Sequence, residues 1–440
     1  MEVDVAIAGA GPAGLACAAA LRRADPSLRV QLFEKTRMTG RGAAILVGIN
    51  GLKALKAIDP AMLDDLLSKA IKLEGSERYN METGELKEWL PMRNDEFSTK
   101  YGFHNALLGW ADITGALRAA LPPGSVTPSA AVAGFERGDG GGVRVLGEGD
   151  EVLATAKVLI GADGWFSGVR AQLLADGPPT FKDAVVWRAR VPRRPEWLPN
   201  ERRTQWWVPP DGMRPGALLA VLIPVPGGDL VWQCHAPLSR LQEKGISFDP
   251  VTGEAGSSHS DGGGGASASA GAGGESAKAR CLKVFEGLAG IGPFMAVVAG
   301  TPESAVTEHG LYQRTPDQIP DGSWGDGMVT LAGDSAHTAY VDGTGLALSL
   351  EDAAVLGWQV KQHGLTEAAL RAYEAARIPR VKAVFTLAAR QGAQMAAGVP
   401  QQQLFEERAK LLYGGLDFEP LGATEAAAAT QTQAAAQAGV

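Results

Sequence analysis

Residues 3–14 read VDVAIAGAGPAG, an apolar run that ends in three glycines with the spacing GxGxxG. The alanine-rich segment 15–21 follows directly and predicts a helix. A second apolar run, residues 28–33, predicts another strand and ends at Glu34. The order is therefore strand, glycine turn, helix, strand, acid. This order predicts a βαβ unit at the start of an α/β fold.

The glycines and the acid have separate roles in such a unit. Gly9 permits a tight turn, Gly11 lets a pyrophosphate approach the backbone, and Gly14 lets the helix pack closely on the strand. The helix start offers free N–H groups and a positive dipole end to phosphate. Glu34 stands about 20 residues beyond the glycines, where an acid accepts ribose hydroxyls. The motif therefore predicts dinucleotide binding.

The composition is that of a globular protein. The chain has 440 residues, 45% hydrophobic and 20% charged, which is enough for two domains. The net charge is −8 and no basic tract occurs, which argues against nucleic acid or an anionic membrane as a partner. No uncharged apolar run approaches the length of a transmembrane segment.

The cysteines indicate the compartment. Cys17, Cys234 and Cys281 form no CxxC pair, and an odd number argues against a disulfide framework. The chain opens on its first predicted strand, with no signal sequence before it. We expect a cytoplasmic protein, or an organellar one if a transit segment has been removed.

The middle of the chain differs from the start in composition and in predicted secondary structure. Short β-rich segments alternate with proline and predict a largely antiparallel sheet in a separate domain. These segments are residues 185–191, 204–208, 218–223 and 230–234. Residues 251–279 are rich in Gly, Ser and Ala and predict a disordered insertion within that domain. A biased tail starts at Glu425.

Two later segments repeat the pattern of the first one, a buried strand followed by a glycine-containing turn. Residues 158–164 (VLIGADG) and 328–337 (MVTLAGDSAH) each predict a buried strand followed by a glycine–acid turn. Segments 143–146 and 151–154 predict a hairpin. Helices are predicted over residues 50–58, 63–71, 111–121, 346–362 and 367–377, with Pro379 kinking the last one or separating it from residues 381–390.

Three motifs stand in order on this chain. They are GxGxxG with Glu34, then GADGWFSGVR at residues 161–170, then LAGDSAH at residues 331–337, followed by Gly343-Thr344-Gly345 and Glu351-Asp352. Together they resemble the class A flavoprotein monooxygenases, the para-hydroxybenzoate-hydroxylase-like group, whose DG and GD motifs the second and third stretches match. The resemblance covers nearly the whole chain apart from the insertion and the tail.

The resemblance implies an α/β fold in which a Rossmann-type FAD-binding domain carries a discontinuous β-rich substrate domain, a glutathione-reductase-like FAD fold. The FAD-binding domain would comprise residues 1–71, 104–180 and 310–400. The substrate domain would comprise residues 72–103 and 181–309. Residues 401–440 would form a C-terminal helix and a low-complexity tail.

The resemblance also implies non-covalent FAD, with NADPH or NADH as a transient reductant and no metal. By the resemblance, Asp334 would contact FAD between its ribityl chain and its pyrophosphate, and Asp163 would lie near the pyrophosphate. Arg170 would support the DG turn. The residues expected at the cofactor are Gly9, Gly11, Pro12, Ala13, Gly14, Glu34, Lys35, Arg41, Asp163, Arg170, Gly333, Asp334, Gly343, Thr344 and Gly345.

The sequence departs from the family pattern near the flavin ring. Val341 stands where a proline is usual, in a loop between His337 and Gly345 that is one residue short, and Leu346 replaces a common asparagine. Trp110 stands where many relatives carry an arginine. Without that arginine, Arg118 or Arg41 would have to supply the contact to the phosphate or the flavin.

The implied reaction is hydroxylation or epoxidation of a small aromatic or hydrophobic substrate. NAD(P)H reduces the flavin, O2 forms a flavin C4a-hydroperoxide, and one oxygen atom passes to the substrate. Candidate pocket residues are Trp187, Trp206, Trp207, Trp232 and Tyr312, although tryptophan in a strand is also typical of a core.

No acid or base is certain from the sequence. His235 and Tyr312 are the candidates, and His235 is equally well explained as a core or surface histidine. His337 is expected to be structural. Two alternatives stay open: a flavin reductase, desaturase or oxidase of the same fold without oxygen insertion, and an FAD-binding protein without turnover.

Overall fold

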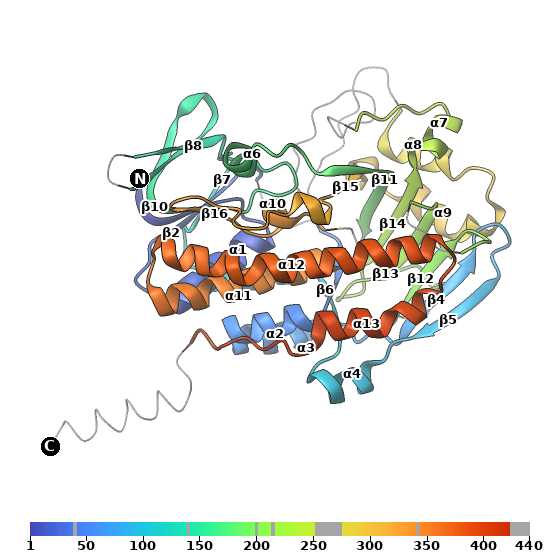
Figure 1. Ribbon diagram of the computed structural model, residues 1–440. Helices are drawn as coiled ribbons and strands as arrows, with labels where there is room; N and C mark the ends of the chain where they lie inside the picture. The colour runs from blue at the N-terminus through green and yellow to red at the C-terminus, as the bar shows by residue number, and fades with distance from the viewer. Residues whose placement is uncertain are drawn as a thin grey trace.

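The computed structural model describes residues 1–37, 42–138, 141–198, 201–212, 216–250, 275–339 and 343–422. Two large β-sheets stand at opposite sides of the view in Figure 1, the first on the left and the second on the right. The predictions for Arg41, Val341, the tail from Glu425 and most of the insertion lie outside the described residues.

The first sheet has the strand order β7-β2-β1-β10-β9-β8, with β16 beside β10. Its strands are β1 (Glu2–Ala8), β2 (Val30–Glu34), β7 (Val126–Pro128), β8 (Gly134–Arg137), β9 (Val143–Leu146), β10 (Val152–Gly161) and β16 (Val329–Leu331). β1 lies parallel to β2 and β10, and β16 pairs in parallel with the end of β10. The turns after β1, β10 and β16 therefore meet at one edge. The predicted hairpin of β9 and β10 is confirmed.

Helices cover this sheet and extend from it. They are α1 (Pro12–Ala24), α2 (Ile49–Ile58), α3 (Pro60–Lys69), α5 (Trp110–Ala119), α6 (Gly168–Leu174), α10 (Asp334–His337), α11 (Thr344–His363) and α12 (Glu367–Ala396). Small side chains let α1 and α11 approach closely, because a Cβ on Gly357 would lie 3.0 Å from Cβ of Ala20. Cys17 is fully buried in this contact region, as expected of a core thiol.

Helix α12 corrects one expectation. It continues through Pro379, so the expected alternative of two separate helices is wrong, while a kink at Pro379 stays a prediction. A proline removes one backbone hydrogen bond from the helix interior. Here Arg377, Ile378 and Val381 are buried around it, so tertiary packing holds both sides of the proline in one helix. Figure 1 shows α12 running from the first sheet toward the second.

The second sheet has the order β15-β11-β14-β13-β12-β4-β5. Its strands are β4 (Gly75–Asn80), β5 (Leu86–Pro91), β11 (Thr180–Val191), β12 (Arg203–Val208), β13 (Leu219–Pro224), β14 (Leu230–Pro237) and β15 (Thr307–Gln313). All neighbours are antiparallel except β12 and β4. The predicted antiparallel sheet is confirmed, and strands β4 and β5 reach it from a distant part of the sequence.

Three helices pack on one face of the second sheet: α7 (Leu238–Glu243), α8 (Ala277–Val284) and α9 (Gly292–Gly300). Helix α8 starts inside the segment expected to be disordered, which corrects the predicted end of the insertion. The hydroxyl of Ser276 accepts a hydrogen bond of 3.1 Å from the backbone N–H of Ala279 and so caps this helix.

The remaining elements connect the two sheets. The two-stranded sheet of β3 (Ala44–Val47) and β6 (Ala106–Gly109) packs its Ala44 and Leu107 against Val225 and Val231 of the second sheet. Helices α4 (Asn94–Tyr101) and α13 (Gln401–Tyr413) and the 3-10 turns Glu148–Asp150, Ala289–Ile291, Glu303–Ala305 and Pro316–Gln318 complete the fold. Within the described ranges, no helix combines the length and apolarity that crossing a membrane requires.

Candidate active site

The glycine turn after β1 fits a dinucleotide. Gly9 has φ +94°, and a Cβ there would lie 2.3 Å from the carbonyl oxygen of Ala162. A Cβ on Gly14 would lie 2.1 Å from the carbonyl oxygen of Gly9. A Cβ on Gly11, in contrast, would meet no protein atom within 4 Å. Gly9 and Gly14 therefore serve internal packing, whereas Gly11 faces open space at the start of α1.

The start of α1 is suited to an anion. Gly11 caps the helix without a side-chain hydrogen bond, and Pro12 stands in its first turn. The carboxylate of Glu34 accepts hydrogen bonds of 2.9 Å from the N–H groups of Ala10 and Thr36, so it lies beside this turn. The neighbouring Lys35 is exposed. The helix start supplies N–H donors and the adjacent acid supplies an acceptor for hydroxyls.

In the DG turn after β10, the carboxylate of Asp163 bonds residues of the same turn. The carboxylate of Asp163 accepts hydrogen bonds from the Ser167 hydroxyl at 2.5 Å and from the Val169 N–H at 3.3 Å. Burial raises the pKa of Asp163 above its ordinary value, against these hydrogen bonds that lower it. Asp163 thus shapes the turn and the start of α6.

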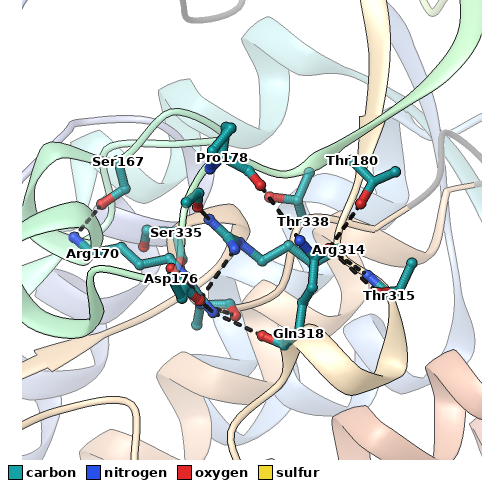
Figure 2. Close-up of polar contacts among 12 residues, drawn as sticks. Ser167, Arg170, Asp176, Pro178, Thr180, Arg314, Thr315, Gln318, Ser335 and Thr338 are labelled. Carbon is teal, nitrogen blue, oxygen red and sulfur yellow. Dashed lines mark hydrogen bonds and ion pairs between the residues drawn. The ribbon is translucent and has the colours of Figure 1, made fainter.

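Arg170 joins the DG turn to the GD turn. Its buried guanidinium donates hydrogen bonds to the backbone carbonyls of Ser335 (3.1 Å) and Ala336 (2.7 Å) (Figure 2). It also contacts both carboxylate oxygens of Asp176. In this arrangement Arg170 holds α10 against the DG segment, whereas the resemblance implied support of the DG turn itself, and its donors are used within the protein.

A second arginine extends this cluster. Arg314 donates to Asp176 at 3.2 Å and to the carbonyl of Gly177 at 3.0 Å, so one carboxylate serves two buried guanidinium groups (Figure 2). The backbone N–H of Arg314 also bonds the carbonyl of Thr338. The segment before β16 and the residues after α10 are therefore fixed to the DG motif.

The GD turn brings Asp334 next to both glycine turns. Gly333 has φ +65°, and a Cβ on it would lie 2.5 Å from Cβ of Ala13. A Cβ on Gly345 would lie 3.6 Å from Oδ1 of Asp334. Burial raises the pKa of the Asp334 carboxyl. Its Oδ2 accepts a 2.7 Å hydrogen bond from the indole N–H of Trp165.

The start of α11 is the second helix N-terminus at this edge. Gly343 has φ +85° and caps the helix without a side-chain hydrogen bond. Arg408, on α13, donates a 2.8 Å hydrogen bond to the hydroxyl of Thr344. Arg408 was not expected at this turn, because no local sequence motif marks it.

A buried ionic network lies beneath the GD turn. Asp352 accepts hydrogen bonds from His337 (2.6 Å), from the N–H of Gly333 (2.8 Å) and from Arg377 (2.8 Å). Arg377 also pairs with Glu351 at 2.5 Å. The cationic partners hold the pKa values of both acids below their ordinary values despite burial. His337 is therefore a structural residue, as expected.

The arginine missing at position 110 is not replaced from within α5. Trp110 begins that helix, and a Cβ on Gly42 would lie 2.4 Å from its ring. Arg118 stands eight residues later, about 12 Å along the helix axis, and is exposed. It therefore cannot take the place of a side chain at Trp110.

The second sheet presents a polar face toward these turns. Strand pairing places Arg188 opposite Gln233, and Val186 between His235 and His309. Trp206 lies on the same face, since it pairs with Val221, which in turn pairs with Gln233. Alternation along the strands turns all these side chains away from α7, α8 and α9.

Trp165 connects this face to the GD turn. Its ring lies 5.4 Å from the ring of His309, centroid to centroid, while its N–H bonds Asp334. Burial and the charge of Arg188 lower the pKa of His235 to about 4 and that of His309 to about 3. Both imidazoles are therefore neutral near pH 7.

Three of the four predicted pocket tryptophans lie elsewhere, which is a correction. Trp187, Trp207 and Trp232 point to the opposite face and belong to the core beneath α8 and α9. The indole N–H of Trp187 bonds Glu308, and that of Trp232 bonds Thr301. Strand alternation separates them from Trp206 and leaves them a packing role.

Tyr312 is also placed apart from His235. Its hydroxyl donates to the backbone carbonyl of Pro250 at 3.1 Å, and its ring packs on Phe166 and Phe181. Burial raises the pKa of Tyr312 to about 12, so it is a poor base. Of the two candidates, only His235 lies on the polar face.

Two uncapped helix starts, an open glycine and two acids meet at one sheet edge, and this set fits FAD. The family model of the NAD(P)-binding Rossmann-like domain matches residues 7–45. Over 396 residues, the chain is 29% identical to a 3-amino-4-hydroxybenzoate 2-monooxygenase of Streptomyces cremeus, covering 88% of this chain and 86% of that protein. Over most of its length, the chain is similar to class A FAD-dependent monooxygenases.

Further comparisons agree with this assignment. The chain is 27% identical over 381 residues to the aurachin C monooxygenase/isomerase of Stigmatella aurantiaca, with 86% of each chain covered. The crystal structure of HpxO from Klebsiella pneumoniae, complexed with FAD and uric acid, matches with a TM-score of 0.68 and 23% identity over 93% of this chain and 92% of that chain. This likeness shows a shared fold.

Proposed function

We propose that this monooxygenase uses FAD, NAD(P)H and O2 to hydroxylate a small aromatic substrate at the polar face of the second sheet. FAD, when bound, supplies the redox and oxygen chemistry. The observation that carries the proposal is the position of Trp165, which contacts Asp334 of the GD turn and His309 of the polar face. A substrate on that face would lie next to the cofactor.

The chain's own groups would bind the cofactor at three places. The N–H groups at the start of α1 face the open side of Gly11 and suit the diphosphate. Glu34 suits the ribose hydroxyls, as in other dinucleotide sites. Asp334 and the uncapped start of α11 suit the ribityl chain and the flavin. Of the other residues expected at the cofactor, Asp163 and Arg170 are engaged within the protein, and Arg41 lies outside the described residues.

His235 and Gln233 would handle the substrate proton. The side-chain amide of Gln233 bonds Nε2 of His235, and among the described residues Nδ1 of His235 has no hydrogen-bond partner. Because an amide can turn either its N–H or its oxygen toward the ring, Gln233 can set Nδ1 as a donor or an acceptor. A neutral His235 can then accept the proton of an aromatic hydroxyl, which activates the ring toward oxygen transfer.

The names of the relatives support an aromatic substrate. One relative is named for an amino-hydroxybenzoate, and HpxO was crystallised with uric acid. We include in the proposal that residues 72–103 and 181–309 form the substrate domain, because their strands share the second sheet. A cytoplasmic location fits the free, buried cysteines Cys17, Cys234 and Cys281.

Oxygen incorporation tests the proposal. The FAD-loaded protein is mixed with NADH or NADPH and ¹⁸O2 across a panel of phenols, aromatic acids and purines, while oxygen uptake and peroxide are recorded together. We expect at least one compound to accelerate NAD(P)H oxidation and to gain one ¹⁸O atom. Turnover without incorporated ¹⁸O would favour a non-oxygenating oxidoreductase, and absence of turnover with every compound would favour a protein that only binds FAD.

A matched pair of variants tests the role of His235. His235→Gln should lower kcat for hydroxylated substrates and remove the fall in activity that protonation of His235 causes around pH 4, since the proton acceptor is lost. His363→Gln, at an exposed position, should leave both unchanged. Equal pH profiles for His235→Gln and the wild-type protein would exclude His235 as the proton acceptor.

A further inference from the structure

Helix α13 contacts both parts of the protein that the proposed function needs. Its Phe405 stacks on Phe97 of α4, with the ring centroids 5.6 Å apart. Its Glu406 pairs with Arg93, directly before α4. Figure 1 shows α13 beside α2 and beneath α12, and it contacts both helices. The helix therefore connects residues of the proposed substrate domain with the helices that cover the first sheet.

The helix is held in place near both of its ends. Arg380 of α12 donates a 3.0 Å hydrogen bond to the carbonyl of Leu412, in the last turn of α13, where a cation is favoured. The same guanidinium pairs with Glu351 of α11 at 3.1 Å. Near the other end, the side-chain amide of Gln391 donates a 2.8 Å hydrogen bond to the carbonyl of Leu404. These bonds fix α13 against α12 and α11.

Arg408 reaches from this fixed helix to the start of α11. It lies about one turn before Leu412 and so on the same side of α13. Its half-buried guanidinium donates a 2.8 Å hydrogen bond to the hydroxyl of Thr344, the first residue of α11. Thr344 precedes Glu351 by two helical turns, about 10 Å along the axis. The first two turns of α11 are therefore held at two points, by Arg408 and by Arg380.

Stabilisation of α11 does not explain the contact with Arg408. The N-terminus of a helix carries a partial positive charge, so a cation beside it is unfavourable for the helix. The residue before the helix is Gly343, with φ +85°, and it makes no side-chain hydrogen bond as a cap. A short polar or acidic side chain at that position would stabilise the helix better than a distant arginine. The contact therefore serves the position of the turn.

We propose that Arg408 is a positioning residue of the cofactor site, which holds the hydroxyl of Thr344 and thereby places the first backbone N–H groups of α11 toward the flavin. This inference rests on the proposed function, which assigns the uncapped start of α11 to the flavin. The next residue of the turn is Gly345, where a Cβ would lie 3.6 Å from Oδ1 of Asp334. A shift of Thr344 would therefore also move the turn relative to the acid assigned to the ribityl chain.

FAD binding by variants of the full chain tests the inference. Arg408→Met keeps the length of the side chain and removes its donors, so the dissociation constant for FAD should rise about tenfold, as expected for loss of a hydrogen bond from a charged group. Arg408→Lys should recover part of the loss, because a charged donor remains. The Tm of each apoprotein should stay within about 2 °C of the wild-type value. Flavin fluorescence during reconstitution and calorimetry of apoprotein give the two readouts.

Arg390→Met is the matched control. Arg390 also joins α12 to α13, through an exposed pair with Glu407, but has no bond to α11. This variant should leave FAD affinity and stability unchanged. Equal weakening of FAD binding in Arg390→Met and Arg408→Met would assign the effect to the general packing of α13 and overturn the proposal.

Two further measurements separate positioning from a structural role. Visible circular dichroism of the FAD-saturated proteins reports the surroundings of the flavin, and it should change in Arg408→Met and return toward the wild-type spectrum in Arg408→Lys. Thr344→Val removes the acceptor of the same bond, so the double variant should bind FAD no more weakly than the weaker single variant. Unchanged FAD affinity and spectrum in Arg408→Met, or fully additive losses in the double variant, would overturn the proposal, as would a loss of FAD affinity that accompanies a large loss of apoprotein stability.

The outcome is separable from that of the proposed function, because these measurements need neither NAD(P)H nor O2. Weaker FAD binding and an altered spectrum in Arg408→Met, without ¹⁸O in any product of the wild-type protein, would support the positioning role and contradict the monooxygenation. Incorporation of ¹⁸O by the wild-type protein, with FAD binding that does not depend on Arg408, would support the monooxygenation and contradict the positioning role.

Discussion

The indole N–H of Trp165 donates a 2.7 Å hydrogen bond to Oδ2 of Asp334. These residues come from the DG and GD motifs, which lie 169 positions apart in the chain. The bond fixes one carboxylate oxygen, while the other oxygen, Oδ1, lies beside Gly345 at the start of α11. Trp165 therefore orients the acid that we assign to the ribityl chain.

Replacing Trp165 should weaken FAD binding. Trp165→Phe keeps an aromatic ring but removes the N–H donor, so the dissociation constant for FAD should rise about tenfold, as expected for a hydrogen bond to a charged group. Flavin fluorescence during reconstitution of apoprotein measures this. Phe166→Leu, at the exposed neighbouring position, should leave FAD affinity unchanged. Unaltered affinity in Trp165→Phe would show that Asp334 needs no such orientation.

Substitutions at Gly11 and Gly14 should have different effects, one on FAD binding and the other on stability. Gly11 has φ −69°, and an added methyl group meets no protein atom within 4 Å. Gly11→Ala should therefore keep the Tm of the apoprotein within about 2 °C while the dissociation constant for FAD rises at least tenfold. Calorimetry of apoprotein and FAD titration provide the two readouts.

Gly14→Ala serves as the contrasting variant. Its methyl group would lie 2.1 Å from the carbonyl oxygen of Gly9, so the turn and α1 must shift apart. We expect a loss of about 3 kcal/mol in the free energy of unfolding of the apoprotein. A stable Gly14→Ala apoprotein, or tight FAD binding by Gly11→Ala, would contradict the division of roles between the two glycines.

Asp176 should be important for stability. It is the shared carboxylate of Arg170 and Arg314, whose side chains are almost completely buried. Asp176→Asn leaves two buried guanidinium groups without their counter-charge, which should cost about 3 kcal/mol in the free energy of unfolding. Asp65→Asn breaks the exposed pair with Lys69 and should change stability by less than about 1 kcal/mol. Urea unfolding of both variants gives the comparison.

The buried histidines should make the protein sensitive to acid. The native state holds the pKa of His235 at about 4, through burial and the charge of Arg188, whereas an unfolded histidine titrates near 6.5. As pH falls from about 6.5 to about 4, the unfolded state takes up a proton that the native state does not, so stability decreases.

His235→Gln isolates this contribution. Between pH 7.5 and pH 4.5 the variant should lose about 2 kcal/mol less stability than the wild-type protein, because one depressed group is gone. Urea unfolding at the two pH values measures the difference. His363→Gln, at an exposed position, should follow the wild-type curve. Equal acid sensitivity of all three proteins would mean that His235 is not held neutral in the native state.

Local sequence determined the cofactor half of this protein. The glycines at residues 9, 11 and 14 and the acid Glu34 form a short-range signal that predicted the βαβ unit and a dinucleotide site, whereas the role expected of Asp334 came from the family resemblance. A turn that needs a glycine, or a strand with period two, is specified within about ten residues. Such features can be recognised before any contact between distant segments is known.

The tertiary structure alone decided which face of the second sheet belongs to the site. Trp187 and Arg188 are adjacent in sequence, yet one packs beneath α8 and the other lies on the polar face with His235. Because successive side chains in a strand point to opposite faces, only the position of the covering helices tells which is core. Likewise, only the assembled neighbours show that no acid among the described residues pairs with the half-buried guanidinium of Arg188, since ion-pair partners come from distant segments.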